Sequence, residues 1–370
     1  MRITLIPSTD KPWDGIEVYS YELAKRLSER NVEVLGIRVG LKDDIKYVNK
    51  NFKLITAGTP NYTNGLGYYY RVFRAVMKNY KEINASDIIH AIGGYYSAIE
   101  LLPFKGKKVV TIIGASSLRE KKKSKKIIRT LYSSIVYRFA KKYIVPNKFI
   151  YEEVKDHYHI SNLEIIPIGV DVKGLRNLEK KEKLKERLGL NPDDVVILYL
   201  GQLVNGKRLP ELLRAFKKVS EKITNAKLVL VAWGYLQDQL IELASSLGLK
   251  DRFILKKPVP YFERKYIYGA ADVFTMIGDS FGDGGISSAV LDALGSGLPV
   301  IVAKTSPNVL VVKDGYNGYT VDPSNAEEVA SAIIKAFENE ETFGKNSLEI
   351  AKELDWDIIV EKILKIYKEL

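Results

Sequence analysis

A basic turn in the second half of the chain has the residue types that hold a diphosphate. The segment VVILYLGQLVNGKRLPELLRAF predicts a strand that ends at Gly201, a loop that carries Lys207 and Arg208, and a helix that begins near Pro210. Glycines at a strand-to-helix turn let the backbone come close to a phosphate, and two cations can neutralise the charge of a leaving group. A solvated basic loop is the alternative interpretation.

An aspartate lies in a second glycine-rich region, DVFTMIGDSFGDGGISSAVLDALGSGLPVIVAKTSPN. We expect a strand that ends at Ile277, an acidic loop, and a helix from about Ser287 with Asp292 in its second turn. The helix is otherwise almost free of charge, so a buried carboxylate there needs a hydrogen-bonding partner, and a ribose diol fits it well. The loop N–H groups expected to face the same cleft are those of Gly284, Gly285 and Ile286.

No metal site is predicted. Asp279 and Asp283 lie among glycines, but their spacing lacks the twelfth-position Glu of an EF-hand loop. The chain has no Cys, which excludes disulfides and any zinc or iron–sulfur site built on thiolates.

Two strand ends in the first half are weaker candidates. In PSTDKPWDGIEVYSYELAKRLSER, Gly15 precedes a helix that opens near Ile16, an arrangement that suits either a phosphate or an ordinary strand-to-helix turn. The spacing is not GxGxxG, so no dinucleotide fingerprint is present. His90 ends the strand DIIHA, where it can act as a base, contact a ligand oxygen, or serve as a satisfied structural residue.

Short apolar runs alternate with longer helical patterns along the whole chain, which is typical of parallel sheets covered by helices. The predicted strands are RITLIP, VEVLGIR, FKLIT, DIIHA, KVVTII, KYIVP and LEIIPIG, followed by VVILYLG, AKLVLVAW, RFILKK, DVFTMI, PVIVA and GYTVD. Two such sets indicate an α/β fold with two doubly wound, Rossmann-like domains, which we place at residues 1–172 and 173–349. Facing domains of this kind are expected to enclose a cleft at the carboxyl ends of their strands.

Positive charge is concentrated in one part of the first half. The 370 residues carry 57 Lys+Arg and 45 Asp+Glu, a net charge of +12. Residues 105–148 hold 14 Lys/Arg and one acid, or +13, so the remaining chain is close to neutral. The densest part, Lys121–Lys126, suits a solvated helix face or an anionic membrane surface. No nucleic-acid-binding motif accompanies the charge, so nucleic acid is not an expected partner.

The composition excludes other classes of protein. With 46% hydrophobic and 28% charged residues, the chain is not expected to be disordered. The longest mostly apolar uncharged runs are about twelve residues, against the ~20 that a membrane-spanning helix needs. The N-terminal MRITLIPSTD is expected to be a first strand and not a signal peptide, which indicates a soluble, cytoplasmic protein.

The order of these elements resembles the retaining glycosyltransferases of family four, which have the two-domain GT-B fold. The resemblance covers nearly the whole chain. It rests on Gly15-Ile-Glu17, IIPIGVD, LYLGQLVNGKRLPELLRAF, LDALGSGLPVIVA, KDGYNGYTVD and LDWDIIVEKILKIYKEL. The last segment is similar to the family's terminal helix, which crosses back to the first domain, so residues 350–370 are expected to join residues 1–172.

The resemblance implies roles for individual residues. Lys207 matches the lysine that binds the donor diphosphate, and Asp292 matches the second acid of a paired motif, which holds the ribose hydroxyls. Gly15 matches a glycine loop near the donor phosphates and the acceptor. The catalytic candidates are then Lys207, Arg208 and His90. The remaining donor-binding candidates are Gly201, Gln202, Asp283, Gly284, Gly285 and Ile286.

Three positions depart from the family pattern. Gln202 stands where a phosphate-binding Arg is usual, so Arg208 is expected to compensate. Gly284 stands at the first acid of the paired motif, with Asp283 one residue out of register. Gly114 replaces a usual His, which leaves His90 or a backbone group to contact the transferred sugar.

The implied activity is transfer of a hexose from a nucleotide-diphosphate sugar to an acceptor hydroxyl with retention, without a metal or other cofactor. The expected acceptor, in the first domain, is a glycan or a lipid-linked saccharide at the inner face of the membrane. The Tyr-rich segment Asn61 to Tyr80 suits a headgroup region, or packing in a core or subunit contact. The rival activities are nucleotide-sugar binding without transfer, and epimerisation of a nucleotide sugar.

Overall fold

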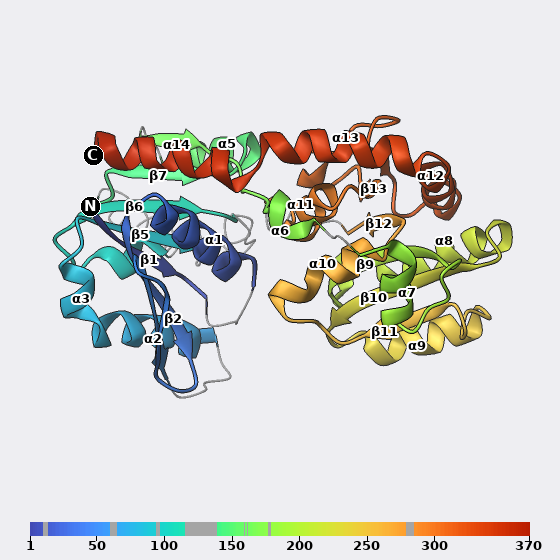
Figure 1. The fold of residues 1–370 in the computed structure, drawn as a ribbon, viewed down its shortest axis with the longest axis horizontal. Coiled ribbons are helices and arrows are strands. Elements are labelled where there is room, and N and C mark those ends of the chain that lie inside the picture. The colour runs from blue at the N-terminus through green and yellow to red at the C-terminus, as the bar shows by residue number, and fades with distance from the viewer. Residues whose placement is uncertain are drawn as a thin grey trace. The chain divides into compact units, whose positions relative to one another are not determined.

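The computed structural model describes residues 1–9, 14–59, 65–93, 97–114, 139–158, 160, 162–176, 179–278 and 285–370. The chain divides into two compact units (Figure 1). The first contains Met1–Gly169, Gly285 and Trp356–Leu370, and the second contains Val170–Phe281 and Ile286–Asp355. The sequence places the same two divisions nearby, after residues 172 and 349.

The first unit is built on an eight-stranded sheet with the order β3-β4-β2-β1-β5-β6-β7-β8. Its strands are β1 (Arg2–Pro7), β2 (Glu33–Gly40), β3 (Asp44–Asn49), β4 (Phe52–Gly58), β5 (Ile88–Gly93), β6 (Lys107–Ile112), β7 (Lys142–Val145) and β8 (Leu163–Ile165). All neighbours pair in parallel except β3, which is antiparallel to β4. Because β2 and β5 lie on opposite sides of β1, the strand order reverses between β1 and β5.

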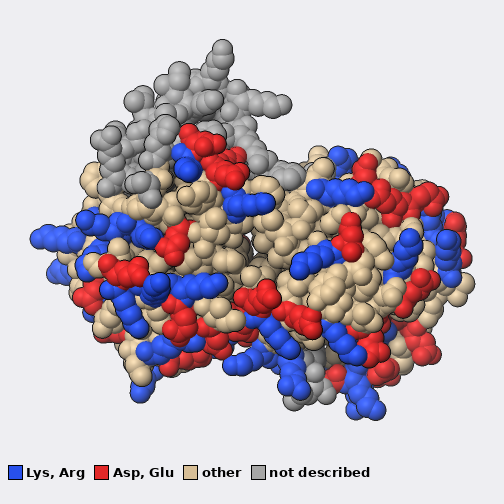
Figure 2. All heavy atoms as spheres, turned by 90° about the horizontal axis from the view of Figure 1, so that it is seen from above, with Lys and Arg blue, Asp and Glu red and all other residues tan. Residues whose placement is uncertain are grey.

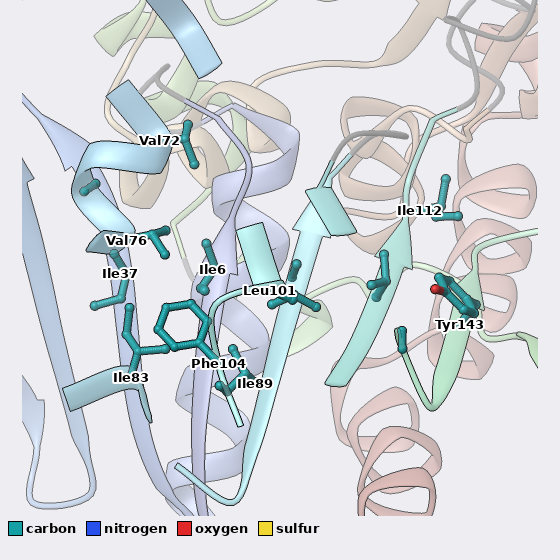
Figure 3. Close-up of a cluster of buried hydrophobic side chains, with 14 of the residues drawn as sticks. Ile6, Ile37, Val72, Val76, Ile83, Ile89, Leu101, Phe104, Ile112 and Tyr143 are labelled. Carbon is teal, nitrogen blue, oxygen red and sulfur yellow. The ribbon is translucent and has the colours of Figure 1, made fainter. Parts of the chain in front are cut away.

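Helices cover both faces of this sheet. They are α1 (Gly15–Glu29), α2 (Gly65–Lys78), α3 (Tyr80–Asn84), α5 (Lys148–Tyr158) and α14 (Trp356–Glu369), with a 3-10 turn η1 (Ser97–Leu101). One apolar cluster joins Val72 and Val76 of α2 to Ile37 and Ile89 on the sheet, and Phe104 packs in the same cluster (Figure 3). Burial of such side chains stabilises the fold by roughly 1.5–3 kcal/mol each.

The C-terminal helix belongs to the first unit. Buried residues of α14, including Ile359 and Ile363, share an apolar cluster with Leu23 and Leu27 of α1. Tyr19 of α1 meets Trp356 edge-on, with ring centroids 5.0 Å apart. A C-terminal helix therefore packs on the first unit as expected, but it begins at Trp356 and not at residue 350, because residues up to Glu353 belong to α13 (Glu340–Glu353) of the second unit.

The second unit is built on a six-stranded parallel sheet with the order β11-β10-β9-β12-β13-β14. Its strands are β9 (Val195–Gln202), β10 (Ala226–Trp233), β11 (Phe253–Lys256), β12 (Val273–Met276), β13 (Val300–Ala303) and β14 (Gly318–Val321). Its helices are α6 (Val172–Leu175), α7 (Lys181–Arg187), α8 (Leu209–Lys222), α9 (Gln237–Ser246), α10 (Arg264–Gly269), α11 (Ser288–Gly295), α12 (Ala326–Glu338) and α13 (Glu340–Glu353). Its 3-10 turns are η3 (Asn205–Lys207), η4 (Tyr261–Glu263) and η6 (Pro307–Leu310).

A buried carboxylate holds β12 against β9. Asp272, just before β12, accepts a hydrogen bond from the Val196 N–H at 2.7 Å. The ammonium groups of Lys181 and Lys185 lie 2.9 and 3.0 Å from its oxygens. Since a buried charge is stable only when it is paired and hydrogen-bonded, this cluster fixes the two central strands next to each other.

The fold class predicted from the sequence is confirmed, and every predicted strand has a counterpart. The one strand that was not predicted is β3, an edge strand with four exposed residues in its six-residue pattern. Ile45 and Tyr47 do alternate with polar residues, but both are exposed, and the alternation covers too few positions to be a clear strand signal.

No helix within the described part of the chain is long and apolar enough to cross a membrane. On the face seen in Figure 2, Lys and Arg are interspersed with Asp and Glu. The basic run Lys121–Lys126 lies outside the described residues.

Candidate functional site

The second unit has a topological switch point between β9 and β12. The chain builds β10 and β11 on one side of β9 and then returns to place β12 on the other side. Helices that leave the two strands in opposite directions open a crevice at their carboxyl ends, where open α/β sheets bind ligands. The two segments that follow β9 and β12 are therefore the candidate site.

Lys207 lies at this switch point. It ends the short turn η3 after β9, and its N–H donates to the Val204 carbonyl at 3.0 Å. A Cβ atom on Gly278, which follows β12, would lie 2.8 Å from the Gly206 carbonyl oxygen and 2.9 Å from the Lys207 Cα. Only glycine allows this approach, so Gly278 lets the lysine turn pack against the end of β12. Within the described chain, Lys207 makes no ion pair.

The close approach leads to a prediction for Gly278→Ala. We expect the added methyl group to push the lysine turn away by roughly 0.5–1 Å and to reduce the sugar transfer implied by the family resemblance about 10-fold, because small displacements of a binding group are costly. Steady-state kinetics with a nucleotide-sugar donor measure the loss, and thermal unfolding checks that the variant is folded. An unchanged rate would mean that the position of the turn does not matter for transfer.

Arg208 follows Lys207 with left-handed backbone angles, φ 53° and ψ 36°. A residue with a side chain pays roughly 1–2 kcal/mol for this conformation. Its guanidinium donates from Nη1 to Glu211 Oε1 at 3.0 Å, in the first turn of α8. Part of the charge expected to compensate for Gln202 is therefore shared with an acid.

We predict that Arg208→Gly is more stable than the wild type by up to ~1 kcal/mol, because glycine adopts this conformation without strain. Transfer should fall less than 10-fold, since Glu211 already shares the guanidinium charge. Arg208→Ala is the matched control, because it removes the same cation without relieving the backbone. Urea unfolding and kinetics compare the three proteins, and equal stability of the two variants would contradict the strain argument.

Gly201 and Gln202 form the end of β9, next to Ala232 and Trp233 of β10. The Tyr199 hydroxyl donates to the Gln202 carbonyl at 2.8 Å, so the backbone at the strand end is held from within the unit. These positions put both residues beside the lysine turn, and their contact with a donor stays a prediction.

Asp292 lies in the second turn of α11, as expected, but its carboxylate has a partner. The guanidinium of Arg264, in α10, donates from Nε to Asp292 Oδ2 at 2.8 Å, and the two side chains are only 12% and 16% exposed. Burial raises the pKa of the Asp292 carboxyl, and the adjacent Arg264 cation opposes this shift. The sequence analysis missed Arg264, because it precedes Asp292 by 28 residues in a segment without a recognisable pattern.

The loop before α11 is described only in part. Gly285 and Ile286 lie directly before the helix, and the Ser287 N–H donates to Asn308 Oδ1 at 2.9 Å. Asp283 and Gly284, which the sequence analysis names as donor contacts, lie outside the described residues.

Gly15 begins α1, and Asp14 caps that helix. One carboxylate oxygen of Asp14 accepts from the N–H groups of Ile16 and Glu17 at 3.0 and 2.9 Å. Because these donors and the positive helix end are already satisfied by a carboxylate, the geometry matches the ordinary capped turn that the sequence analysis left as an alternative.

The expectation of a catalytic role for His90 is wrong in this structure. His90 has no exposed surface, its Nδ1 is 2.5 Å from the Tyr367 hydroxyl, and its Nε2 is 2.7 Å from Thr111 Oγ1. Burial lowers the pKa of its imidazole to about 3. Both nitrogens are used, so His90 is the satisfied structural residue that links β5, β6 and α14.

A second buried titratable group of the first unit lies near the β1–β5 switch point. Ser8, which follows β1, donates from its hydroxyl to Glu100 Oε2 at 2.8 Å, and both side chains are buried. Burial raises the pKa of the Glu100 carboxyl to about 8, and the Ser8 hydrogen bond opposes this shift. The sequence analysis did not single out Glu100, because nothing local marks its burial.

No cluster of three or more His, Cys, Asp or Glu side chains that could hold a metal ion occurs among the described residues.

Comparison with known proteins gives two family matches that together span most of the chain. Residues 13–173 match Glycosyltransferase Family 4, and residues 180–353 match Glycosyl transferases group 1. These two ranges fall on the first and second units, respectively.

Three curated relatives illustrate the range of similarity. The chain is 28% identical to the uncharacterized glycosyltransferase MJ1607 of Methanocaldococcus jannaschii over 52% of this chain and 50% of that protein. It is 22% identical to MJ1069 of the same organism over 96% of this chain and 95% of that protein. It is 28% identical to a GDP-mannose-dependent phosphatidylinositol monomannoside mannosyltransferase of Mycolicibacterium smegmatis over 46% of each chain. The matched region thus spans about half the length of MJ1607 and of the mannosyltransferase.

Solved structures share the fold. Sucrose-phosphate synthase from Thermosynechococcus elongatus aligns with a TM-score of 0.82 and 19% identity over 100% of this chain and 98% of that one. Anabaena HepE, solved with UDP and glucose, aligns with a TM-score of 0.78 and 18% identity over 100% of this chain and 99% of that one. With two Rossmann-like units, a returning C-terminal helix and both family matches, the chain belongs to the group 1 glycosyltransferases of family four, which have the GT-B fold.

Proposed function

We propose that this protein transfers a hexose from a nucleotide-diphosphate sugar to an acceptor hydroxyl with retention of anomeric configuration. The observation that carries the proposal is Lys207, an ammonium group without an ion-pair partner in the described chain, held at the β9–β12 switch point by the close approach of Gly278. A strand-end crevice with a cation suits a diphosphate.

The proposed reaction does not need a side-chain nucleophile. The bond between the anomeric carbon and the diphosphate oxygen breaks, and a bond from that carbon to the acceptor oxygen forms on the same face. The proton of the acceptor hydroxyl passes to the departing phosphate oxygen. Negative charge grows on the diphosphate during this step, and Lys207, with Arg208 as a weaker second cation, stabilises it without a metal ion.

Asp292 would hold the ribose of the donor, and Gly201, Gln202, Gly285 and Ile286 would contribute backbone groups around it. A carboxylate is a strong acceptor for hydroxyl donors in a partly buried site. What supports these contacts is that Gly201 and Gln202 end β9 beside the switch point, Gly285 and Ile286 lie just before α11, and Asp292 lies on α11. Since UDP is bound in the structure of Anabaena HepE, UDP is a rational first probe for this chain.

A glycan or lipid-linked acceptor is proposed for the first unit. The mannosyltransferase relative acts, by its name, on a phosphatidylinositol glycolipid. Helix α2 also exposes an apolar stripe of Tyr70, Phe73 and Met77, which are 49%, 46% and 38% accessible. An exposed apolar stripe next to cations such as Arg74 suits the interfacial region of an anionic membrane. We therefore propose a cytoplasmic protein that binds the inner face of the membrane peripherally.

The membrane part of the proposal predicts that reversing the charges of Lys121, Lys122 and Lys123 to Glu weakens binding to vesicles containing phosphatidylglycerol at least 10-fold. Each cation near such a surface contributes about 1 kcal/mol. Co-sedimentation measures the change, and pure phosphatidylcholine vesicles are the control. Binding that does not change on charge reversal would return this segment to the solvated-face interpretation.

The transfer proposal is tested by incubating the purified protein with a panel of nucleotide sugars and membrane lipids and measuring nucleoside diphosphate release. Release with at least one donor, together with a glycosylated product, is the expected result. Binding without release would favour the rival of a nucleotide-sugar-binding protein without transferase activity. Isomerisation of the free donor would favour the epimerase.

A further inference from the structure

Arg264 binds the two carboxylate oxygens of Asp292 at different distances. Its Nε donates to Oδ2 at 2.8 Å, whereas its Nη2 lies 3.5 Å from Oδ1. A carboxylate has about four lone-pair sites, so Oδ2 is firmly anchored while Oδ1 keeps most of its capacity to accept a hydrogen bond. The Asp292 side chain is 16% exposed, so it is not fully closed off from solvent.

Arg264 is itself held in place by Tyr261, at the start of η4. The Arg264 Nη1 donates to the Tyr261 carbonyl at 2.9 Å, and Nη2 donates to the Tyr261 hydroxyl at 2.8 Å. The guanidinium carbon also lies 3.5 Å from the centre of the Tyr261 ring. Stacking and hydrogen bonding together fix the plane of an arginine in a way that lysine cannot reproduce.

These contacts decide where the Asp292 carboxylate points. An unpaired aspartate rotates freely about two side-chain bonds, whereas one oxygen bound to a fixed guanidinium leaves a single orientation. An acid must be held in this way if it is to recognise a hydroxyl group at one place.

We propose that Arg264 is a positioning residue for the nucleotide, holding Asp292 so that Oδ1 accepts a hydrogen bond from a ribose hydroxyl of a nucleoside diphosphate. The inference rests on the proposed function, in which Asp292 meets the ribose. Arg264 need not touch the nucleotide.

The test separates positioning from a general loss of structure by comparing two kinds of ligand. Isothermal titration measures the affinity of the full-length protein for UDP, GDP and ADP, and then for the 2′-deoxy and 3′-deoxy forms of the nucleotide that binds. A charge-assisted hydrogen bond adds 1.5–3 kcal/mol, so the wild type should bind at least one deoxy form ~10–100-fold more weakly. The readout is the affinity for the nucleotide divided by the affinity for its deoxy form, called the ribose ratio below.

Three variants address Arg264. Arg264→Lys keeps the charge but loses the fork and the stacking, and Arg264→Leu removes the charge as well. Tyr261→Phe removes only the hydroxyl that accepts from Nη2. Arg187→Lys is the matched control, because Arg187 also lies over a tyrosine ring, that of Tyr266 at 5.2 Å, and it pairs with Glu179 instead of Asp292. Thermal unfolding shows whether each variant is folded.

We expect the ribose ratio to fall toward 1 in Arg264→Lys, to fall less in Tyr261→Phe, and to be unchanged in Arg187→Lys. If Arg264→Leu does not fold, Arg264→Lys and Tyr261→Phe still test whether Arg264 positions Asp292. If Arg264→Lys weakens the binding of ribose and deoxyribose ligands equally, the positioning role is overturned. Tighter nucleotide binding by Arg264→Lys would also overturn it, because Arg264 would then compete with the ribose for Asp292. A wild type that binds nucleotides with a ribose ratio of 1 overturns this inference alone, and a wild type that binds no nucleotide overturns the proposed function as well.

Discussion

Replacing Lys207 by Met is expected to lower the turnover number for sugar transfer by 10²–10³-fold, or about 3–4 kcal/mol of transition-state stabilisation. The loss should fall mainly on turnover, because charge on the diphosphate increases as the glycosidic bond breaks. Methionine keeps most of the apolar stem of lysine and removes the charged end, so packing against Gly278 is largely preserved. Initial rates of nucleoside diphosphate release at saturating donor measure the effect.

Lys222→Met is the control for Lys207→Met. Lys222 is an exposed lysine in the last turn of α8, the helix that follows the lysine turn, and its replacement should leave the rate unchanged. Wild-type turnover in Lys207→Met, with both proteins folded, would remove the diphosphate site from the β9–β12 switch point.

Acid is expected to destabilise the first unit through His90. The folded-state pKa of His90 is about 3, below its ordinary value of 6.5, so the unfolded chain binds a proton that the folded chain does not. The contribution of neutral, buried His90 to the free energy of unfolding is therefore fully present above pH 6.5. It falls by about 1.4 kcal/mol per pH unit between pH 6.5 and 3. Urea unfolding of the wild type and of His90→Gln from pH 4.5 to 7.5 isolates this effect. The stability advantage of the wild type should shrink as the pH falls.

Glu100→Gln supplies a control of opposite sign. The pKa of Glu100 is raised from 4.5 to about 8 in the folded protein, so the unfolded chain ionises first and the wild type loses stability as the pH rises from 4.5 to 8. The free energy of unfolding of the wild type should therefore decrease relative to that of Glu100→Gln as the pH increases. A stability difference between the wild type and His90→Gln that is constant over the whole range would contradict the buried, neutral state of His90.

His90 and Asp292 show how far local patterns go. Both were recognised from their position, one at the expected end of an apolar strand and the other in an uncharged helix. In the structure β5 continues past His90 to Gly93, so His90 lies inside the strand. Their partners are remote in the sequence: Tyr367 lies 277 residues after His90, and Arg264 lies 28 residues before Asp292. Whether a titratable group is available for chemistry depends on these partners, and no spacing rule contains them.

By itself, the sequence determined the two largely parallel sheets and the lysine turn at the end of β9. These features depend on apolar periodicity and on turn residues, which act over a few neighbouring positions. The helix that returns to the first unit was expected only from the family resemblance. The tertiary structure alone decided that Gly278 packs against Lys207 and that Arg264 holds Asp292. It also decided that His90 and Glu100 are buried, which shifts the pKa of each side chain from its ordinary value. The reason is physical: close approach, pairing and desolvation arise only when segments far apart in the chain are packed together.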